Sequence, residues 1–315
     1  MVRLQDTART QLAMRTLTLL TAAQAPLTAE ALCHAMGVAL ILDYHPEPME
    51  LIADEIPDPA SVVECCMGLV AIDPVTRIIT LAQYDIGHNM RMRWNDVFTR
   101  CPDDARLAKW CMAYLSLGAF SSGPCCGAEA LTRRLEQYPF LDYASRHWSQ
   151  HVREDLSQQK TNGDTIDDTG RLLSQEKRKN LESSLQVCEA GPEFHEAMLV
   201  NGKPVLDWNV GRFQSVSSLQ VATRYGLTRV VQDIITASPE MISEQDSYGT
   251  SALHEAAKSG WNDLVQMLLK AEAQPGLMND EETSPLNYPA EGGHAGMTSI
   301  VHSICLTRME FIQSV

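Results

Sequence analysis

The sequence predicts a mostly α-helical protein in which an N-terminal domain containing a β-hairpin precedes a short solenoid of paired helices. Three observations predict this fold class. Apolar residues recur at helical spacing over much of the chain. The stretch LVAIDPVTRIITLA has two apolar runs around a central turn, as a β-hairpin requires. The last third repeats a helix-turn-helix pattern about every 33 residues, a period typical of solenoids.

Size and charge limit the classes of function. The 315 residues are 44% hydrophobic and 21% charged, an ordinary composition for a folded chain long enough for two domains. The formal charge of −15 argues against non-specific binding to nucleic acid or anionic membranes, because that binding depends on clustered Lys and Arg. No segment is long enough to span a bilayer. We therefore expect a protein or peptide partner, basic in character, and neither a membrane nor nucleic acid.

The cysteines and the N-terminus indicate a compartment. Nine cysteines are an odd number, and they include the adjacent pairs Cys65-Cys66 and Cys125-Cys126. This pattern favours reduced thiols over a disulfide framework. The N-terminus lacks the continuous apolar run of a signal peptide. The protein is expected in the cytoplasm or the nucleus.

The clearest repeat unit runs from Asp246 to Lys270. Asp246 and Gly249 suit a tight turn, Ser251 can cap the first helix, and Gly260 suits its left-handed end. The second helix carries apolar residues on one face, namely Leu264, Val265, Leu268 and Leu269. Such a unit cannot bury its own apolar face, so copies are expected on either side.

Two degenerate copies flank this unit. Leu219 precedes Leu253 by 34 positions, and Leu286 follows it by 33. The period and the order of small residues, Leu and Gly resemble ankyrin repeats. By this resemblance the copies span 212–245, 246–278 and 279–312. Pro289 should distort the first helix of the third copy.

The first hundred residues predict a winged-helix-like domain. Apolar spacing indicates helices over 7–23 and 28–36, and Asp58-Pro59 is a good start for a third. The hairpin around Asp73-Pro74 follows, and three helices before a hairpin are typical of a winged helix.

The complete prediction has four parts. The winged-helix-like domain is followed by a helical extension with amphipathic helices over 103–118 and 128–152, then by a polar linker with a short helix, and then by a short ankyrin-repeat α-solenoid. The boundaries are 1–100, 101–153, 154–211 and 212–315.

Several pieces of the first half resemble a known family. LTAEALCHAMGV, ECCMGLVAID, RIITLAQYD, CMAYLSLGAFSSGPC and YPFLDYASRHW resemble the region that follows the NACHT domain in fungal NACHT and ankyrin-repeat proteins of the STAND class, which are NLR-like. The resemblance covers most of residues 10–153 and continues into the repeats. It implies the C-terminal part of a larger protein, with a sensor or adaptor role. Gln83 departs from the family, which usually has histidine ahead of the tyrosine matched by Tyr84.

The sequence motifs give little support for an enzyme. The chain has no phosphate loop, since its only Gly-Lys pair, Gly202-Lys203, is followed by proline. One alternative function is a Cys-dependent hydrolase at Cys125, because GPCCG fits the outline of a nucleophile elbow, although no strand precedes it. His147 and His151 lie four apart but lack a third ligand. We therefore expect a protein that is not an enzyme and that binds neither a metal nor a cofactor.

A second alternative is a DNA-binding regulator acting through the winged helix. The candidate recognition helix, PASVVECCM, has no basic residue, and the hairpin offers only Arg77. Base readout needs Arg, Lys, Asn or Gln at positions that face the groove. A packing role within the protein is therefore favoured for this domain.

The repeats predict a partner-binding face. Ankyrin arrays bind along the concave surface formed by the turn tips and the first helices. By the resemblance, the partner-binding residues are Arg224, Tyr225, Tyr248, Glu255, Lys258, Glu281, Glu282, Tyr288 and Glu291. Tyrosines surrounded by charges are typical of recognition surfaces, while ordinary solvated helix surface is the alternative. The acidic third tip favours basic segments. The resemblance gives His254 a structural role, bonded to the turn backbone.

Overall fold

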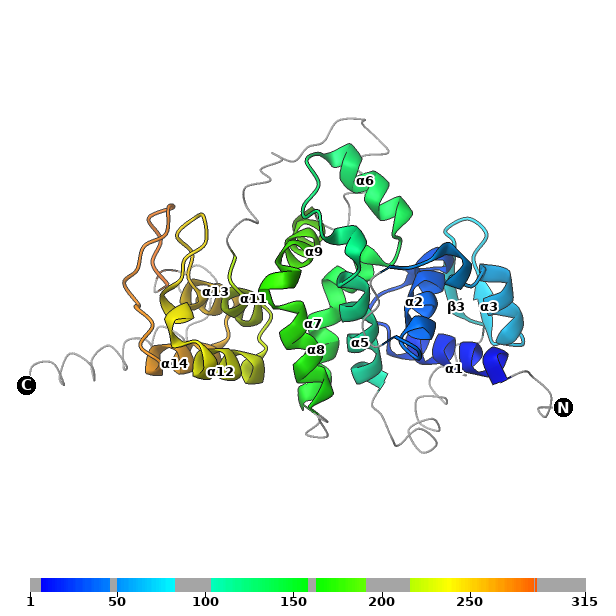
Figure 1. Cartoon of the computed structure of the whole chain (residues 1–315), viewed down its shortest axis with the longest axis horizontal. Helices are drawn as coiled ribbons and strands as arrows, with labels where there is room; N and C mark the ends of the chain where they lie inside the picture. The colour runs from blue at the N-terminus through cyan, green and yellow to red at the C-terminus, as the bar shows by residue number, and fades with distance from the viewer. Residues whose placement is uncertain are drawn as a thin grey trace, which may run out of the picture. The chain divides into compact units, whose positions relative to one another are not determined.

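The chain divides into two compact units, each described by itself. The computed structural model describes residues 7–45, 50–82, 103–157, 163–190, 216–285 and 287. Unit 1 is Met1–Trp208 and unit 2 is Asn209–Val315 (Figure 1). Both are mostly helical, as predicted. Within the described residues, no helix combines the length and the apolar character needed to cross a bilayer.

In the N-terminal part of unit 1, the described residues (7–45 and 50–82) form three α-helices and a small antiparallel sheet. In chain order these are α1 (Thr7–Ala22), β1 (Leu27–Thr28), α2 (Ala29–Ile41), the short 3-10 helix η1 (Ala53–Glu55), α3 (Pro59–Cys65), β2 (Val70–Ile72) and β3 (Ile78–Leu81). The strand order is β1-β3-β2, so that Ile79 of β3 pairs with Leu27 on one side and Ile72 on the other. The predicted hairpin is confirmed, and α2 extends beyond the expected end at residue 36.

Local sequence signals account for these elements. The Thr28 hydroxyl accepts a hydrogen bond from the Ala31 backbone N–H at 3.2 Å and caps α2. Asp58 caps α3 through bonds of 3.0 Å from two backbone N–H groups, with Pro59 at the first helical position. In the hairpin, Asp73 accepts from the turn backbone. Each cap satisfies donors that the helix start would leave unpaired.

The rest of unit 1 is a helical body. It contains α5 (Asp103–Leu115), η2 (Gly118–Phe120), α6 (Ala128–Gln137), α7 (Leu141–Ser157), α8 (Asp164–Leu172), η3 (Gln175–Lys177) and α9 (Arg178–Ala190). The single helix expected over 128–152 is wrong, since the structure has α6 and α7 in its place. Pro139 lies at the break, where its ring and missing N–H prevent a continuous helix.

Residues 163–190 fold onto the body, although they fall within the polar linker with a short helix that the sequence predicted over 154–211; residues 191–211 lie outside the described residues. Helices α8 and α9 pack against α5 and α7. Leu181 and Leu185 of α9 are buried. Asn180 donates to the backbone carbonyls of Leu115 and Leu117 at 2.9 and 2.7 Å. Burial of Asn180 is compensated by these bonds, one of which satisfies the Leu115 carbonyl at the end of α5.

A buried polar chain joins three segments of unit 1. His151 contacts the Asp104 carboxylate through Nδ1 and the Tyr143 hydroxyl through Nε2, both at 2.9 Å. The Gln24 backbone N–H donates to the same hydroxyl at 3.1 Å. The histidine is fully buried. It therefore ties α5 and α7 to the loop after α1, in agreement with the packing role favoured for it over a metal site.

The described part of unit 2, residues 216–285 and 287, contains two stacked helical pairs. Its elements are α11 (Ser218–Arg224), α12 (Thr228–Ala237), the 3-10 helix η5 (Pro239–Ser243), α13 (Ala252–Ser259) and α14 (Asn262–Lys270). Helix α11 packs against α12 and α13, and α14 packs against α12 and α13. Leu219 and Leu253 are buried at matching positions of α11 and α13, as the repeat predicted. Most of the third copy, with Leu286 and Pro289, lies outside the described residues.

A glycine lets the two repeats approach closely. Gly226 has a φ of +70°, and a Cβ atom placed there would lie 2.7 Å from Cε2 of Trp261. The Trp261 indole Nε1 donates to the Arg224 carbonyl at 3.2 Å. The ring of one repeat thus covers the turn of the repeat before it. Only glycine combines this backbone conformation with the absence of a side chain.

Replacing this glycine should weaken the stack. We expect Gly226→Ala to lower the free energy of opening of residues 218–237 by about 1–3 kcal/mol, because it adds both backbone strain and a clash. Amide hydrogen exchange of the full chain measures this, with α5–α9 as an internal reference. Gly276→Ala is the control, since Gly276 has open space around it. Equal protection in both variants would contradict the packing.

Candidate functional site

The loop before α13 has a defined shape. The Asp246 carboxylate accepts from the backbone N–H groups of Tyr248 and Thr250, each at 2.9 Å. The Asp246 N–H donates to the Thr250 carbonyl at 2.9 Å. Gly249 has a φ of +71°, the left-handed conformation that favours glycine. Asp246 and Gly249 therefore build the turn that the sequence predicted.

The loop of the next repeat copies this shape with different residues. The Asn279 side-chain oxygen accepts from the backbone N–H groups of Glu281 and Thr283 at 3.1 and 2.8 Å. Its own N–H donates to the Thr283 carbonyl at 3.1 Å. Glu282 occupies the place of Gly249 with a φ of +55°. A non-glycine residue is strained in this region, which makes Glu282 unusual.

The two loops lie side by side. The Asp280 backbone N–H donates to the Tyr248 carbonyl at 2.9 Å. A Cβ atom on Gly249 would lie 3.1 Å from the Cα atom of Asn279. The backbones are therefore in direct contact, and the tips of successive repeats form one continuous edge.

His254 fixes the loops to the first helix. The Ser251 N–H donates to His254 Nδ1 at 3.1 Å, so the ring proton is on Nε2, which donates to the Thr283 carbonyl at 3.2 Å. The ring is buried, and desolvation lowers its pKa below the usual 6.5. A neutral imidazole thus connects one repeat to the loop of the next, which confirms its structural role.

Gln220 has the same role in the preceding repeat, and the sequence analysis missed it. Its Oε1 accepts from the Ser217 N–H at 2.6 Å, and its Nε2 donates to the Thr250 carbonyl. Gln220 precedes His254 by 34 positions, the same spacing as Leu219 and Leu253. The 34-residue spacing was the signal in the sequence that could have identified the role of Gln220. An amide can replace a neutral imidazole because it too offers one acceptor and one donor in fixed positions.

Two of the predicted partner-binding residues are used within the array. The Arg224 guanidinium forms two hydrogen bonds to the Glu255 carboxylate at 2.9 and 3.0 Å. Only 7% of the Glu255 side chain is exposed, so the expectation of an exposed residue is wrong here. Its position on α13 faces α11, and the ion pair across the two first helices covers it. This pair holds neighbouring helices in register.

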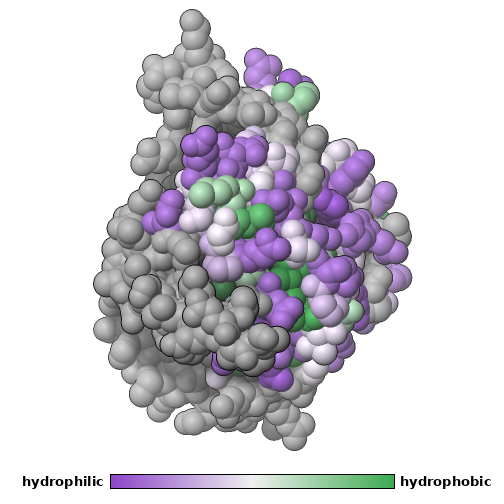
Figure 2. Space-filling view, turned by 90° about the vertical axis from the view of Figure 1, so that its left-hand side faces the viewer, coloured by the Kyte–Doolittle hydropathy of each residue, from purple (hydrophilic) through white to green (hydrophobic). Residues whose placement is uncertain are grey.

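The remaining predicted residues differ in exposure. Lys258 on α13 and the tip residues Glu281 and Glu282 are exposed. Tyr225 and Tyr248 are half-buried. Tyr288 and Glu291 lie outside the described residues. Among the described residues on the face shown in Figure 2, hydrophilic side chains predominate and hydrophobic ones form smaller areas between them.

Comparison with known proteins identifies the repeats. Residues 219–306 match the family model of ankyrin repeats, in three copies. This part of the chain consists of ankyrin repeats. The crystal structure of EF0377, an ankyrin repeat protein, is similar with a TM-score of 0.29 and 16% sequence identity, over 56% of this chain and 98% of that chain. A search of curated proteins gave no match.

The ankyrin repeats indicate protein partners, since this fold generally serves protein interaction and is typically non-enzymatic. The surroundings of Cys125 are those of a structural cysteine. It is buried, and desolvation raises the pKa of its thiol. Its backbone N–H and carbonyl are both bonded by the Gln186 amide at 2.8 and 2.9 Å. A reactive cysteine needs a lowered pKa and access, so this environment disfavours the nucleophile that the alternative requires.

Metal binding has no site in the described residues. No group of three or more His, Cys, Asp or Glu side chains there is arranged to hold an ion. His151 is engaged by Asp104 and Tyr143, and the His147 ring lies against Tyr143 at a tilt, with ring centroids 4.7 Å apart. Both histidines of the suspected pair therefore serve packing.

The neutral state of His254 should make the repeats sensitive to acid. Because the folded pKa is lowered, the unfolded chain binds the proton first as pH falls below about 6.5, and stability present above that pH is lost. We expect the opening free energy of residues 252–270, from hydrogen exchange, to fall by at most about 1.4 kcal/mol per pH unit. His254→Gln, which copies Gln220, should remove this slope. If the pH dependence of the opening free energy is unchanged in the variant, it arises from groups other than His254.

Thiol labelling should distinguish the two adjacent cysteines. Cys126 is exposed whereas Cys125 is buried with a raised pKa. Iodoacetamide near neutral pH should therefore modify Cys126 well before Cys125, because the thiolate is the reacting form. Peptide mapping by mass spectrometry measures both rates. Cys126→Ser should remove the fast reaction and Cys125→Ser should leave it. Faster labelling of Cys125 would support the hydrolase.

Proposed function

We propose that this protein is a non-catalytic interaction protein whose ankyrin repeats bind a protein or peptide along the loop tips and first helices. It would act as the sensor or adaptor part of a STAND-like protein in the cytoplasm or nucleus. The observation that carries the proposal is the continuous edge formed by the loops at 246–250 and 279–283. Contact between their backbones holds exposed side chains at fixed spacing, and a pre-organised surface loses little entropy on binding.

The charge of the tips supports a basic partner segment. Asp280, Glu281 and Glu282 are consecutive exposed carboxylates on one tip. Tyr248 lies on the neighbouring tip, half-buried, and offers an aromatic surface next to them. Lysine or arginine on an extended peptide could pair with the carboxylates while its backbone follows the edge.

The strained backbone at Glu282 also supports a binding role for this residue. A left-handed glutamate costs roughly 1 kcal/mol relative to glycine, and the equivalent residue of the preceding loop is Gly249. Strain of this kind occurs at binding sites, where a side chain is needed despite its cost. We infer that the Glu282 carboxylate contributes to the partner-binding face.

We further propose that residues 1–100 form the predicted winged-helix-like domain, with a packing role. The order of helix, strand, two helices and hairpin supports this, as does the β1-β3-β2 sheet. Nothing in α3 favours DNA, because it contains no basic residue. Arg77 in the hairpin is bonded to Glu30 at 2.5 and 3.0 Å, so its charge is already compensated.

Charge reversal at the acidic tip tests the proposal. Peptides selected from a random library on the full chain should be rich in Lys and Arg. We expect Glu281→Lys/Glu282→Lys to weaken their binding at least about tenfold by calorimetry, because attraction becomes repulsion. Asp233→Lys/Glu240→Lys changes the charge equally at exposed positions on α12 and η5. Equal loss in both variants, or none in either, would contradict the proposed face.

Glu282→Gly separates binding from folding. In this variant the opening free energy of residues 252–285, measured by hydrogen exchange, should rise by about 1 kcal/mol, because the strain at residue 282 is relieved. The selected peptides should nevertheless bind less tightly. A gain in stability with unchanged binding would remove Glu282 from the face.

A further inference from the structure

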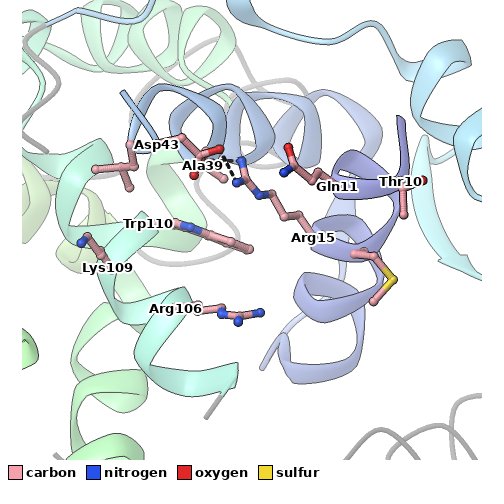
Figure 3. A pocket seen from close by; sticks show the side chains of 10 residues that line it. Thr10, Gln11, Arg15, Ala39, Asp43, Arg106, Lys109 and Trp110 are labelled. Atoms are coloured by element: carbon pink, nitrogen blue, oxygen red, sulfur yellow. Dashed lines mark hydrogen bonds and ion pairs between the residues drawn. The ribbon is translucent and has the colours of Figure 1, made fainter. Parts of the chain in front are cut away.

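Unit 1 contains a cavity that neither the repeats nor the packing role explains. It has a volume of about 490 Å³ and lies between α1, the end of α2 and α5. Side chains of Gln11 and Arg15 on α1 and of Arg106 and Trp110 on α5 point toward one another across it (Figure 3). Small-molecule sites in proteins typically have volumes of about 300–1,000 Å³.

The cavity is positively charged in a strongly acidic chain. Three cations, Arg15, Arg106 and Lys109, line it against a single carboxylate, Asp43. The whole chain has a formal charge of −15, so this local excess runs against its composition. Basic side chains gathered around a hollow attract an anion, and the low-dielectric wall strengthens that attraction.

The three cations are not equivalent. Arg15 is held by the Asp43 carboxylate at 2.5 Å and by the Ala39 carbonyl at 2.7 Å. Lys109 is exposed and also feels the charge of Asp168 on α8. Within the described residues, no carboxylate forms an ion pair with Arg106 or Lys109. Arg106 therefore carries the charge in this cavity that a ligand would compensate.

The rest of the wall is partly apolar, with the polar side chains of Thr10 and Gln11 on the α1 side. Trp110 is 6% exposed, and Met14, Ala39 and Leu42 complete this side of the cavity. An aromatic or aliphatic body would displace water from these side chains, while an inorganic ion would leave them wet. The cavity thus combines one fixed guanidinium, a second guanidinium that pairs with no carboxylate of the described residues, and a wall that is apolar around Trp110 and Met14.

We propose that this cavity binds a small organic anion, a carboxylate or a phosphate monoester attached to an apolar body. The anionic group pairs with Arg106, whose planar fork matches both head groups, and Lys109 adds charge at the rim. The apolar body lies against Trp110 and Met14. Because α1 and α5 both contact the ligand, binding stabilises unit 1.

Calorimetry of the full chain with four probes tests this inference. We expect phenyl phosphate or phenylpropanoate to bind, with inorganic phosphate at least about tenfold weaker and phenol, which lacks the charge, also at least about tenfold weaker. The tighter of the two organic anions identifies the preferred head group. Failure of both to bind at millimolar concentration overturns the proposal, as does equal binding of inorganic phosphate.

Substitution locates the site. Arg106→Gln/Lys109→Gln should weaken the organic anion at least about tenfold, whereas Arg133→Gln/Lys270→Gln, a matched change at exposed positions outside the cavity, should not. Arg106→Lys is the conservative control. It keeps the charge, so it should retain part of the affinity for the organic anion. Thermal unfolding without ligand checks each variant. Full affinity in the Gln double variant overturns the site.

Discussion

The repeat unit depends on its neighbour, and this constraint shapes the whole C-terminal unit. A pair of short helices cannot bury its apolar face alone. Here the cover is provided by specific contacts between repeats: Trp261 lies against Gly226, and His254 and Gln220 each reach the loop of the following repeat. The same contacts position the loop tips, so the features that stabilise the stack also create its candidate binding edge.

Polar residues have a comparable part in the N-terminal unit. His151, Asn180 and Gln186 are buried, and each bonds to groups of a distant segment. A buried polar group without partners would destabilise the fold, so these bonds fix one arrangement of helices. The basic cavity lies elsewhere in this unit, where Asp43 and the Ala39 carbonyl hold Arg15 in place. We thus propose two different binding surfaces, an acidic edge for basic segments and a basic hollow for a small anion.

Local signals in the sequence predicted many of the elements, but they missed the break between α6 and α7 and several long-range contacts. The caps Thr28 and Asp58, the turn at Asp246 and the repeated leucines follow from short-range rules and were predicted. Glu255 was expected on the surface because helix periodicity cannot reveal an ion pair with another repeat. Residues 163–190 were expected to belong to a polar linker, yet the side chains of Asn180 and Gln186 satisfy carbonyls far away in the chain. The basic cavity joins residues 10–15, 39–43 and 106–110, which no local pattern connects.

The contact between Gly226 and Trp261 is the most direct test of the stacked repeats, because it joins two repeats through atoms that meet only in this packing. Nuclear Overhauser effects on the full chain measure it. We expect a cross-peak between the Gly226 α-protons and the Trp261 ring protons, with the glycine signals shifted upfield by the ring. Unshifted glycine signals without this cross-peak would contradict side-by-side packing of the repeats.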